Sequence, residues 1–160
     1  MNKTNKTNAM RLLDAAKIPY RAVEYEYDES DLGGEHVAAV TGMNPDQVFK
    51  TLVARGEKQG ILVFCIPVSC TLDLKKAAHA AGDKKVEMIH MKELLGLTGY
   101  IRGGCSPVGM KKKYPTFMDE TAELYDEIAI SGGARGLQMV LNPMELMEYA
   151  DITSVDLVEY

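Results

Sequence analysis

The chain reads Phe49-Lys50-Thr51-Leu52-Val53-Ala54 and, after a polar segment, Ile61-Leu62-Val63-Phe64-Cys65-Ile66. Two short apolar runs joined by a polar, glycine-containing segment are typical of a β-hairpin with a loop of several residues. Because side chains alternate between the two faces of a strand, Lys50 must share a face with Leu52 and Ala54. We take this hairpin as the centre of the fold and assign the rest around it.

Helices and strands interleave on both sides of the hairpin. Val23, Tyr25 and Tyr27 alternate with polar residues, which indicates a half-buried strand, and Pro143 suits the first turn of a helix. Because consecutive strands are expected to pair antiparallel, the order of elements predicts an α/β (α+β) fold, a mixed sheet with packed helices. The other predicted elements are helices 9–17 (capped by Asn8), 35–40, 73–81 and 91–95, a helical turn at Asn44-Pro45, and strands 127–130, 137–141 and 155–158.

Length and composition indicate one ordinary globular domain. The chain has 160 residues, 46% of them hydrophobic and 26% charged, with no internal repeat or linker. We therefore expect a single domain over residues 1–160, with residues 1–8 as a loose tail. No apolar run approaches the roughly 20 residues that span a bilayer, and the polar N-terminus lacks the apolar segment of a signal peptide. These features predict a cytoplasmic protein that does not bind membranes.

The number of cysteines, the spacing of the histidines and the net charge of the chain argue against several classes of function. Three cysteines, an odd number, favour reduced thiols, and the three histidines have no metal-ligand spacing. We expect neither a metal nor a cofactor. The net charge of -5 argues against a protein that coats nucleic acid by bulk electrostatics. It leaves room for a small basic patch at residues 111–113.

A glycine-rich loop is the strongest local signal for a site. It reads Gly103-Gly104-Cys105-Ser106-Pro107-Val108-Gly109, and such a loop offers bare backbone N–H groups to a phosphate, a carboxylate or a developing oxyanion. Its spacing differs from a Walker A loop. A long connector is the alternative interpretation. Cys105 has no histidine nearby in sequence to activate it, so we treat it as a loop residue and not as a nucleophile.

Two further features leave alternatives open. Lys50 lies inside an apolar run, where its ammonium either meets an anion or protects a sheet edge from aggregation. The turn from Ser131 to Gly136 supplies a hydroxyl and the guanidinium of Arg135, which could hold a substrate or simply cap the turn.

Three segments in this order resemble one family, and the resemblance extends over nearly the whole chain. They are residues 49–53, 103–109 and 130–138, and together they are similar to the YbaK/EbsC family of free-standing editing proteins, related to the insertion domain of bacterial prolyl-tRNA synthetase. The resemblance implies a curved, bifurcated mixed sheet and hydrolytic proofreading of a mischarged tRNA. Cys-tRNA(Pro) is the implied substrate, with Cys-tRNA(Cys) as a further one. The alternatives are another mischarged tRNA such as Ala-tRNA(Pro), or a non-catalytic module that binds aminoacyl-adenosine or phosphate.

The resemblance also implies a mechanism and roles for individual residues. The thiol of the substrate cysteine attacks its own ester and releases a cyclic thiolactone, while the loop at 103–109 stabilises the oxyanion. The partners implied are the 3′ aminoacyl-adenosine end of tRNA and, transiently, prolyl-tRNA synthetase. Gln138 departs from the family pattern, since many relatives carry an acidic residue there. The candidate catalytic residues are Lys50, Gly103 and Gly104, and the candidate substrate-binding residues are Tyr20, Thr51, Cys105, Ser106, Pro107, Val108, Gly109, Ser131, Gly132, Arg135, Gly136 and Gln138.

Overall fold

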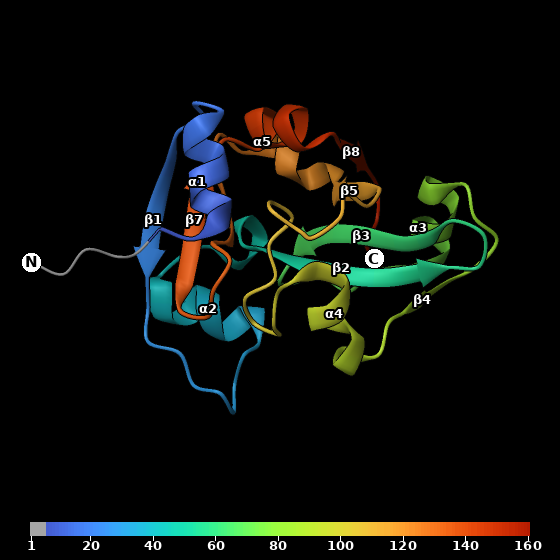
Figure 1. The fold of residues 1–160 in the computed structure, drawn as a ribbon, viewed down its shortest axis with the longest axis horizontal. Coiled ribbons are helices and arrows are strands. Elements are labelled where there is room, and N and C mark those ends of the chain that lie inside the picture. The colour runs from blue at the N-terminus through green and yellow to red at the C-terminus, as the bar shows by residue number, and fades with distance from the viewer. Residues whose placement is uncertain (1–5) are drawn as a thin grey trace, which may run out of the picture.

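Two β-sheets lie side by side in the computed structural model, which describes residues 6–160 (Figure 1). One is an antiparallel sheet of three strands in the order β1 (Tyr20–Glu24), β7 (Leu137–Leu141) and β6 (Ile128–Ser131). The other has five strands in the order β4 (Val86–Met88), β2 (Phe49–Gly56), β3 (Gly60–Pro67), β5 (Thr116–Asp119) and β8 (Ile152–Val155). A parallel bridge between Val48 and Ala129 links them. The expected mixed α/β architecture is confirmed.

The central hairpin is confirmed, whereas some strands beyond it were missed or misplaced. Strands β2 and β3 pair antiparallel from Phe49–Pro67 to Gly56–Gly60. The consecutive strands β6 and β7 also pair antiparallel, as expected. Strand β5, which was not predicted, pairs parallel with β3 and β8, neither of which is its neighbour in chain order, and this makes the five-stranded sheet mixed. The last strand ends at Val155, and Val158 makes only an isolated bridge with Leu72. Strands β4 and β5 were not predicted, because three or four residues carry too little periodicity to detect.

Strand β1 begins and ends earlier than the alternation of tyrosines indicates. It covers Tyr20–Glu24, so Tyr25 and Tyr27 lie beyond it. The register against β7 explains this boundary, since the five residues of β1 pair with all five residues of β7 and leave no partner for Tyr27.

The helices begin and end at side-chain and glycine caps. Asp73 accepts hydrogen bonds from the N–H groups of Lys75 and Lys76 at the start of α3, and Gly82 ends that helix in the left-handed conformation. The remaining α-helices are α1 (Asn8–Ala15), α2 (Gly34–Thr41), α4 (Leu94–Thr98) and α5 (Pro143–Ala150), with short 3₁₀ turns at η1 (Pro45–Gln47), η2 (Met91–Glu93) and η3 (Glu120–Leu124). None of the helices formed by residues 6–160 has the length and apolarity needed to cross a membrane.

The start of the chain differs from the expected tail. Thr7, and not Asn8, caps α1, and its hydroxyl donates to the carbonyl of Gly132 at 2.6 Å. Lys6 pairs with Asp14 of the same helix. Residues 6–8 therefore contact the body of the protein, and residues 1–5 of the expected tail lie outside the described residues.

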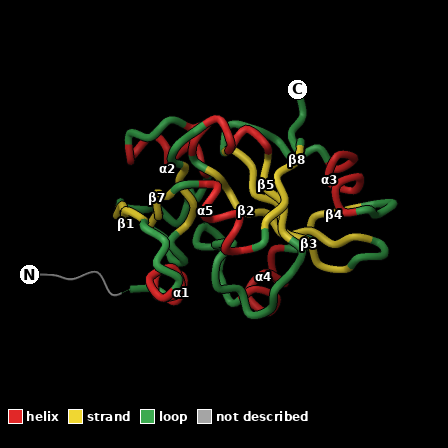
Figure 2. The backbone as a smooth tube through the Cα atoms, turned by 90° about the horizontal axis from the view of Figure 1, so that it is seen from above, coloured by secondary structure: helices red, strands yellow, loops and turns green. Residues whose placement is uncertain are grey.

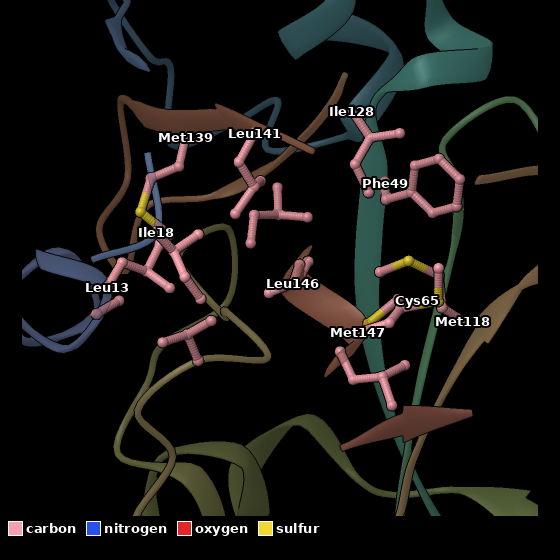
Figure 3. Packing of buried hydrophobic residues seen from close by; sticks show 14 of the residues in the cluster. Leu13, Ile18, Phe49, Cys65, Met118, Ile128, Met139, Leu141, Leu146 and Met147 are labelled. Carbon is pink, nitrogen blue, oxygen red and sulfur yellow. The ribbon is translucent and has the colours of Figure 1, made fainter. Parts of the chain in front are cut away.

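One hydrophobic core joins the two sheets. Leu146 and Met147 of α5 pack between Met139 and Leu141 of β7 and the side chains of β2, β3 and β5 (Figure 3). Seen from above, α5 lies between the two groups of strands (Figure 2). Because this cluster fills one face of each sheet, the opposite face of β7 is left for other contacts.

Candidate active site

A cavity of about 490 Å³ opens where the two sheets meet. Its walls are the start of α2, the strand β2, the ends of β6 and β7, the segment from β4 to α4, and the glycine-rich loop. This volume is within the usual range for a site that takes a small ligand. The lining residues are Leu32, Gly33, Gly34, Val37, Val48, Phe49, Lys50, Thr51, Leu52, Val53, Val68, Met88, Ile89, Met91, Leu94, Arg102, Gly103, Cys105, Ser131 and Gln138.

Lys50 contributes an unpaired ammonium group to this cavity. It is half-buried, and within residues 6–160 it forms neither an ion pair nor a side-chain hydrogen bond. Among the described residues strand β4 pairs with β2 only from Ala54 to Gly56, so Lys50 lies on a part of β2 that β4 does not cover. The cation is therefore available to an anionic or polar group of a ligand.

The glycine-rich loop is packed against the turn that follows β6. A Cβ on Gly104 would lie 3.2 Å from three backbone atoms of Ala134 and Arg135, so only glycine permits this contact without a shift. Gly103 has φ +85°, a conformation that glycine adopts without strain. The hydroxyl of Tyr100 donates to the carbonyl of Val108 and holds the two ends of the loop together.

The loop's amides are not equivalent. The N–H of Gly104 donates to Ile101 and the N–H of Val108 to Ser106, so both are already in use. In the described part of the chain the N–H groups of Gly103 and Cys105 have no protein acceptor. Both residues line the cavity, which makes these two N–H groups the ones that remain for a ligand oxygen.

Ser131 and Gln138 form a buried polar end of the cavity. They are cross-strand partners in β6 and β7, and their exposed fractions are 8% and 5%. The Ser131 hydroxyl oxygen accepts from the N–H of Gly133. The carbonyl oxygen Oε1 of Gln138 is buried without any hydrogen-bond partner among the described residues.

The Cys105 thiol lines the cavity in a protonated form. Burial raises the pKa of Cys105 to about 12. At neutral pH its thiolate fraction is then on the order of one part in 10⁵. The neighbouring Cys65 is fully buried, and burial likewise raises its pKa to about 12.

The structure brings six of the expected site residues together and leaves the others outside the cavity. Tyr20 lies outside this cavity. It pairs with Leu141 and packs against the core between the sheets, whereas Val23 pairs with Gln138 on the opposite face of β1. The six residues in the cavity are Lys50, Thr51, Gly103, Cys105, Ser131 and Gln138; outside it are Tyr20, Gly104, Ser106, Pro107, Val108, Gly109, Gly132, Arg135 and Gly136.

Arg135 lies behind the site and supports it. Its Nε donates to the carbonyl of Arg102 at 2.8 Å, and its guanidinium pairs with Glu29 at 3.4 Å. Arg135 thus ties the glycine-rich loop to the segment before α2. It is exposed to a separate shallow hollow that it shares with Gly136.

One wall of the cavity was missed from the sequence. Leu32, Gly33 and Gly34 line it, and a Cβ on Gly34 would lie 2.2 Å from the side chain of Val68. The adjacent glycines, directly before a predicted helix, were a visible signal of this close approach. Met88 at the rim carried no such signal because β4 was not recognised, and nothing in the predicted helix 91–95 marked Met91 as part of this wall.

The charge of the cavity is opposite to that of the whole protein. Its lining includes the cations Lys50 and Arg102 and, among residues 6–160, no carboxylate or histidine. The described residues also contain no group of three or more side chains suited to hold a metal ion. The site is therefore a small basic hollow without an acid–base pair of its own.

Comparisons with known proteins agree with this geometry. The model of the aminoacyl-tRNA editing domain family matches residues 33–149. The chain belongs to this family. The expected family resemblance is thereby confirmed, and the expected enzyme class, an aminoacyl-tRNA deacylase, is confirmed at the level of the family.

Individual relatives support the same assignment. The chain is 47% identical over 154 residues to an Enterococcus faecalis protein named "Putative Cys-tRNA(Pro)/Cys-tRNA(Cys) deacylase EbsC", covering 93% of this chain and 94% of that one. It is similar to a solved structure described as a putative trans-editing enzyme for prolyl tRNA synthetase, with TM-score 0.81, 28% identity and coverage of 98% and 100%. A hypothetical protein, APE2540, shares the fold with TM-score 0.84 at 22% identity, covering 93% of this chain and 97% of its own.

Proposed function

We propose that this protein removes cysteine from mischarged tRNA, with Cys-tRNA(Pro) as the main substrate and Cys-tRNA(Cys) as a second one. The observation that carries the proposal is the cavity itself. It combines an unpaired Lys50 and two unused backbone N–H groups with the absence, in the described lining, of a histidine or carboxylate base. Such a site binds and polarises an ester but supplies no nucleophile of its own.

Because the described lining offers no base to activate a nucleophile of the protein, we assign the nucleophile to the substrate. The sulfur of the substrate cysteine attacks its own ester carbonyl, so that a C–S bond forms and the C–O bond to the ribose breaks. The thiol proton is lost to solvent, and the released ribose oxygen takes up a proton. The products are the cyclic thiolactone of cysteine, which water then opens, and a tRNA with a free terminal hydroxyl.

Each group of the cavity has a role in this reaction. The N–H groups of Gly103 and Cys105 donate to the carbonyl oxygen as negative charge develops on it, and losing one such donor costs roughly 2.7–4 kcal/mol of transition-state stabilisation. Lys50 holds a phosphate or ribose oxygen of the terminal adenosine as a point charge. Cys105, with its pKa raised to about 12, stays a thiol and takes no covalent part.

The choice of cysteine over other amino acids depends on the nucleophile of the substrate as much as on the size of its side chain. A pocket that only measures volume gains about 1–3 kcal/mol per methylene, too little to separate cysteine from alanine reliably. Substrate-assisted attack excludes alanine and proline because they have no thiol. The identity of the tRNA is then supplied by a transient complex with prolyl-tRNA synthetase.

The test is deacylation of tRNA(Pro) charged with cysteine, alanine or proline, with and without prolyl-tRNA synthetase. We expect cysteine to be released fastest and to appear first as the thiolactone, trapped by hydroxylamine. Preferential release of alanine would contradict the cysteine assignment. If aminoacyl-adenosine analogues bind but no aminoacyl group is released, the protein is a binding module and not an editing enzyme.

A further inference from the structure

Gln138 carries the one buried side-chain oxygen or nitrogen atom of the described cavity lining that has no hydrogen-bond partner. The residue lies on the central strand β7 and is 5% exposed, and its Oε1 atom is buried. The side chains on either side of it in β7, Leu137 and Met139, belong to the core between the sheets, so Gln138 projects from the opposite face. A buried acceptor without a donor destabilises the protein unless a ligand supplies the donor.

The position of Gln138 limits which part of a substrate reaches it. Met88 and Met91, at the rim of the same cavity, are 43% and 55% exposed, so the cavity runs from an open rim to a closed polar end. The nucleotide stays attached to the tRNA and must remain toward the rim. The group that reaches the closed end is the aminoacyl group, and its strongest donor is the α-amino group.

The charges around Gln138 decide the protonation state of that amine. The charged groups that line the cavity are Lys50 from β2 and Arg102 from the loop after α4, both cations. The Cys105 thiol is protonated, and in the described lining α2, β4, β6, β7 and α4 add no charge. A protonated ammonium would be repelled here and would find no counter-ion, whereas a neutral amine needs only an acceptor.

We infer that Gln138 is a specificity-determining residue whose Oε1 accepts a hydrogen bond from the α-amino group of the substrate in its neutral form. The inference rests on the proposed function for the identity of the ligand. With an acidic residue at this position the same pocket would favour the charged ammonium instead.

The experiment measures binding and so does not depend on turnover. The probes are the non-hydrolysable 3′-amide analogue of cysteinyl-adenosine, its desamino counterpart with a 3-mercaptopropionyl group, and the alanyl analogue. Calorimetry at pH 8 and pH 6 compares the unmodified protein with Gln138→Leu, which removes the acceptor at similar volume, and with Gln138→Glu, which supplies a counter-charge. Melting temperatures confirm that each variant is folded.

We expect the unmodified protein to prefer the amine-bearing cysteinyl analogue over the desamino one by about tenfold at pH 8. This preference shrinks at pH 6, because a free α-amine titrates near pH 7.7–8.0 and only its neutral form binds. Gln138→Leu loses the preference, and Gln138→Glu retains it at pH 6. The alanyl analogue, which keeps the amine, behaves as the cysteinyl one does.

Three results would overturn the inference. These are an unchanged preference in Gln138→Leu, an equal loss of affinity for both analogues, and a preference that follows the thiol and not the amine. Failure of the proposed function looks different. In that case the unmodified protein releases no amino acid from tRNA, whether or not the analogues show the coupling to Gln138.

Discussion

The cavity and the C-terminal end of the molecule both contain a lysine and a buried polar residue, yet they use them in opposite ways. At the C-terminal end, Lys76 binds Asp156 at 2.9 Å and the carbonyl of Val158 at 2.7 Å, and its ammonium lies 4.2 Å from the ring of Tyr160. In the cavity, Lys50 has no partner among the described residues. One lysine stabilises the fold, and the other is available to a ligand.

The buried polar residues repeat this contrast. Asp119 is fully buried and accepts from the N–H of Leu157 and from both the N–H and hydroxyl of Thr121. Gln138 is almost as buried, but no donor in the described part of the chain reaches its carbonyl oxygen. Unused hydrogen-bonding capacity thus distinguishes the site from structural polar clusters. Asp156 is an intermediate case. Among the described residues one of its carboxylate oxygens has no hydrogen-bond partner, while the other pairs with Lys76.

The largest expected effect is that of Lys50→Ala on catalysis. Since this side chain has no partner within residues 6–160, its loss should reduce deacylation of Cys-tRNA(Pro) by at least about a hundredfold, with little change in stability. Lys76→Ala is the matched control and should do the reverse, lowering the melting temperature while leaving the rate near its original value. Single-turnover deacylation and thermal unfolding measure both. Near-normal turnover in Lys50→Ala would remove this residue from the mechanism.

The second effect concerns Asp119 and appears in stability only. Asp119→Ala leaves the buried N–H of Leu157 and the partly buried N–H of Thr121 without an acceptor, and we expect a loss of about 2–4 kcal/mol in the free energy of unfolding. Asp119→Asn keeps one acceptor oxygen and should lose less. Urea denaturation followed by circular dichroism provides the values. Equal destabilisation by both substitutions would show that the charge, and not the hydrogen bonds, holds this cluster.

Gly104→Ala should lower both the stability of the protein and the rate of deacylation, each to an intermediate degree. The new Cβ lies 3.2 Å from the backbone of Ala134 and Arg135, so the loop must shift and carry the N–H groups of Gly103 and Cys105 with it. We expect a loss of about 1–3 kcal/mol in stability and a clear fall in rate. Gly96→Ala is the control, because its Cβ would meet nothing within 4 Å and α4 would gain helix propensity. A fully active Gly104→Ala would show that the loop position is not critical.

Cys105→Ala should have the smallest effect at neutral pH. With the pKa of Cys105 raised to about 12, the thiol is protonated at working pH, so deacylation should stay within about twofold. The stabilising effect of this raised pKa is complete below the unfolded value near 9 and is lost as the pH rises from there toward 12. The melting temperature should therefore fall less steeply between pH 8 and pH 11 in the variant than in the unmodified protein. Loss of activity with unchanged analogue binding would indicate a covalent enzyme thioester.

Local signals in the sequence were sufficient for much of the fold. The hairpin, the helix capped by Asp73 and the strand from Leu137 to Leu141 were all predicted, because each depends on residues adjacent in the chain. The parallel pairing of β5 with β3 and β8 joins segments distant in sequence and left no local trace. The same holds for the three residues of β4, which form part of the cavity wall.

The site was predictable only in part, for the same reason. Lys50, Gly103, Cys105 and Gln138 came from motifs, and the fold brings them into one cavity. Tyr20 was assigned to the pocket by resemblance, but the register of β1 against β7 places it on the other face of the sheet. Which face a strand residue occupies depends on a partner strand more than a hundred residues away, and no local pattern near Tyr20 specifies that partner.

The half-paired state of β2 has a consequence for solubility. In the described residues β4 pairs with β2 only from Ala54 to Gly56, so the stretch around Thr51 presents a strand edge toward the cavity. Exposed edges recruit strands from other molecules, and a lysine on such an edge is a common protection against that pairing. Lys50 lies on this stretch, so under the proposed function one ammonium group would serve both the ligand and the colloidal stability of the protein. The two interpretations of Lys50 offered by the sequence are therefore compatible.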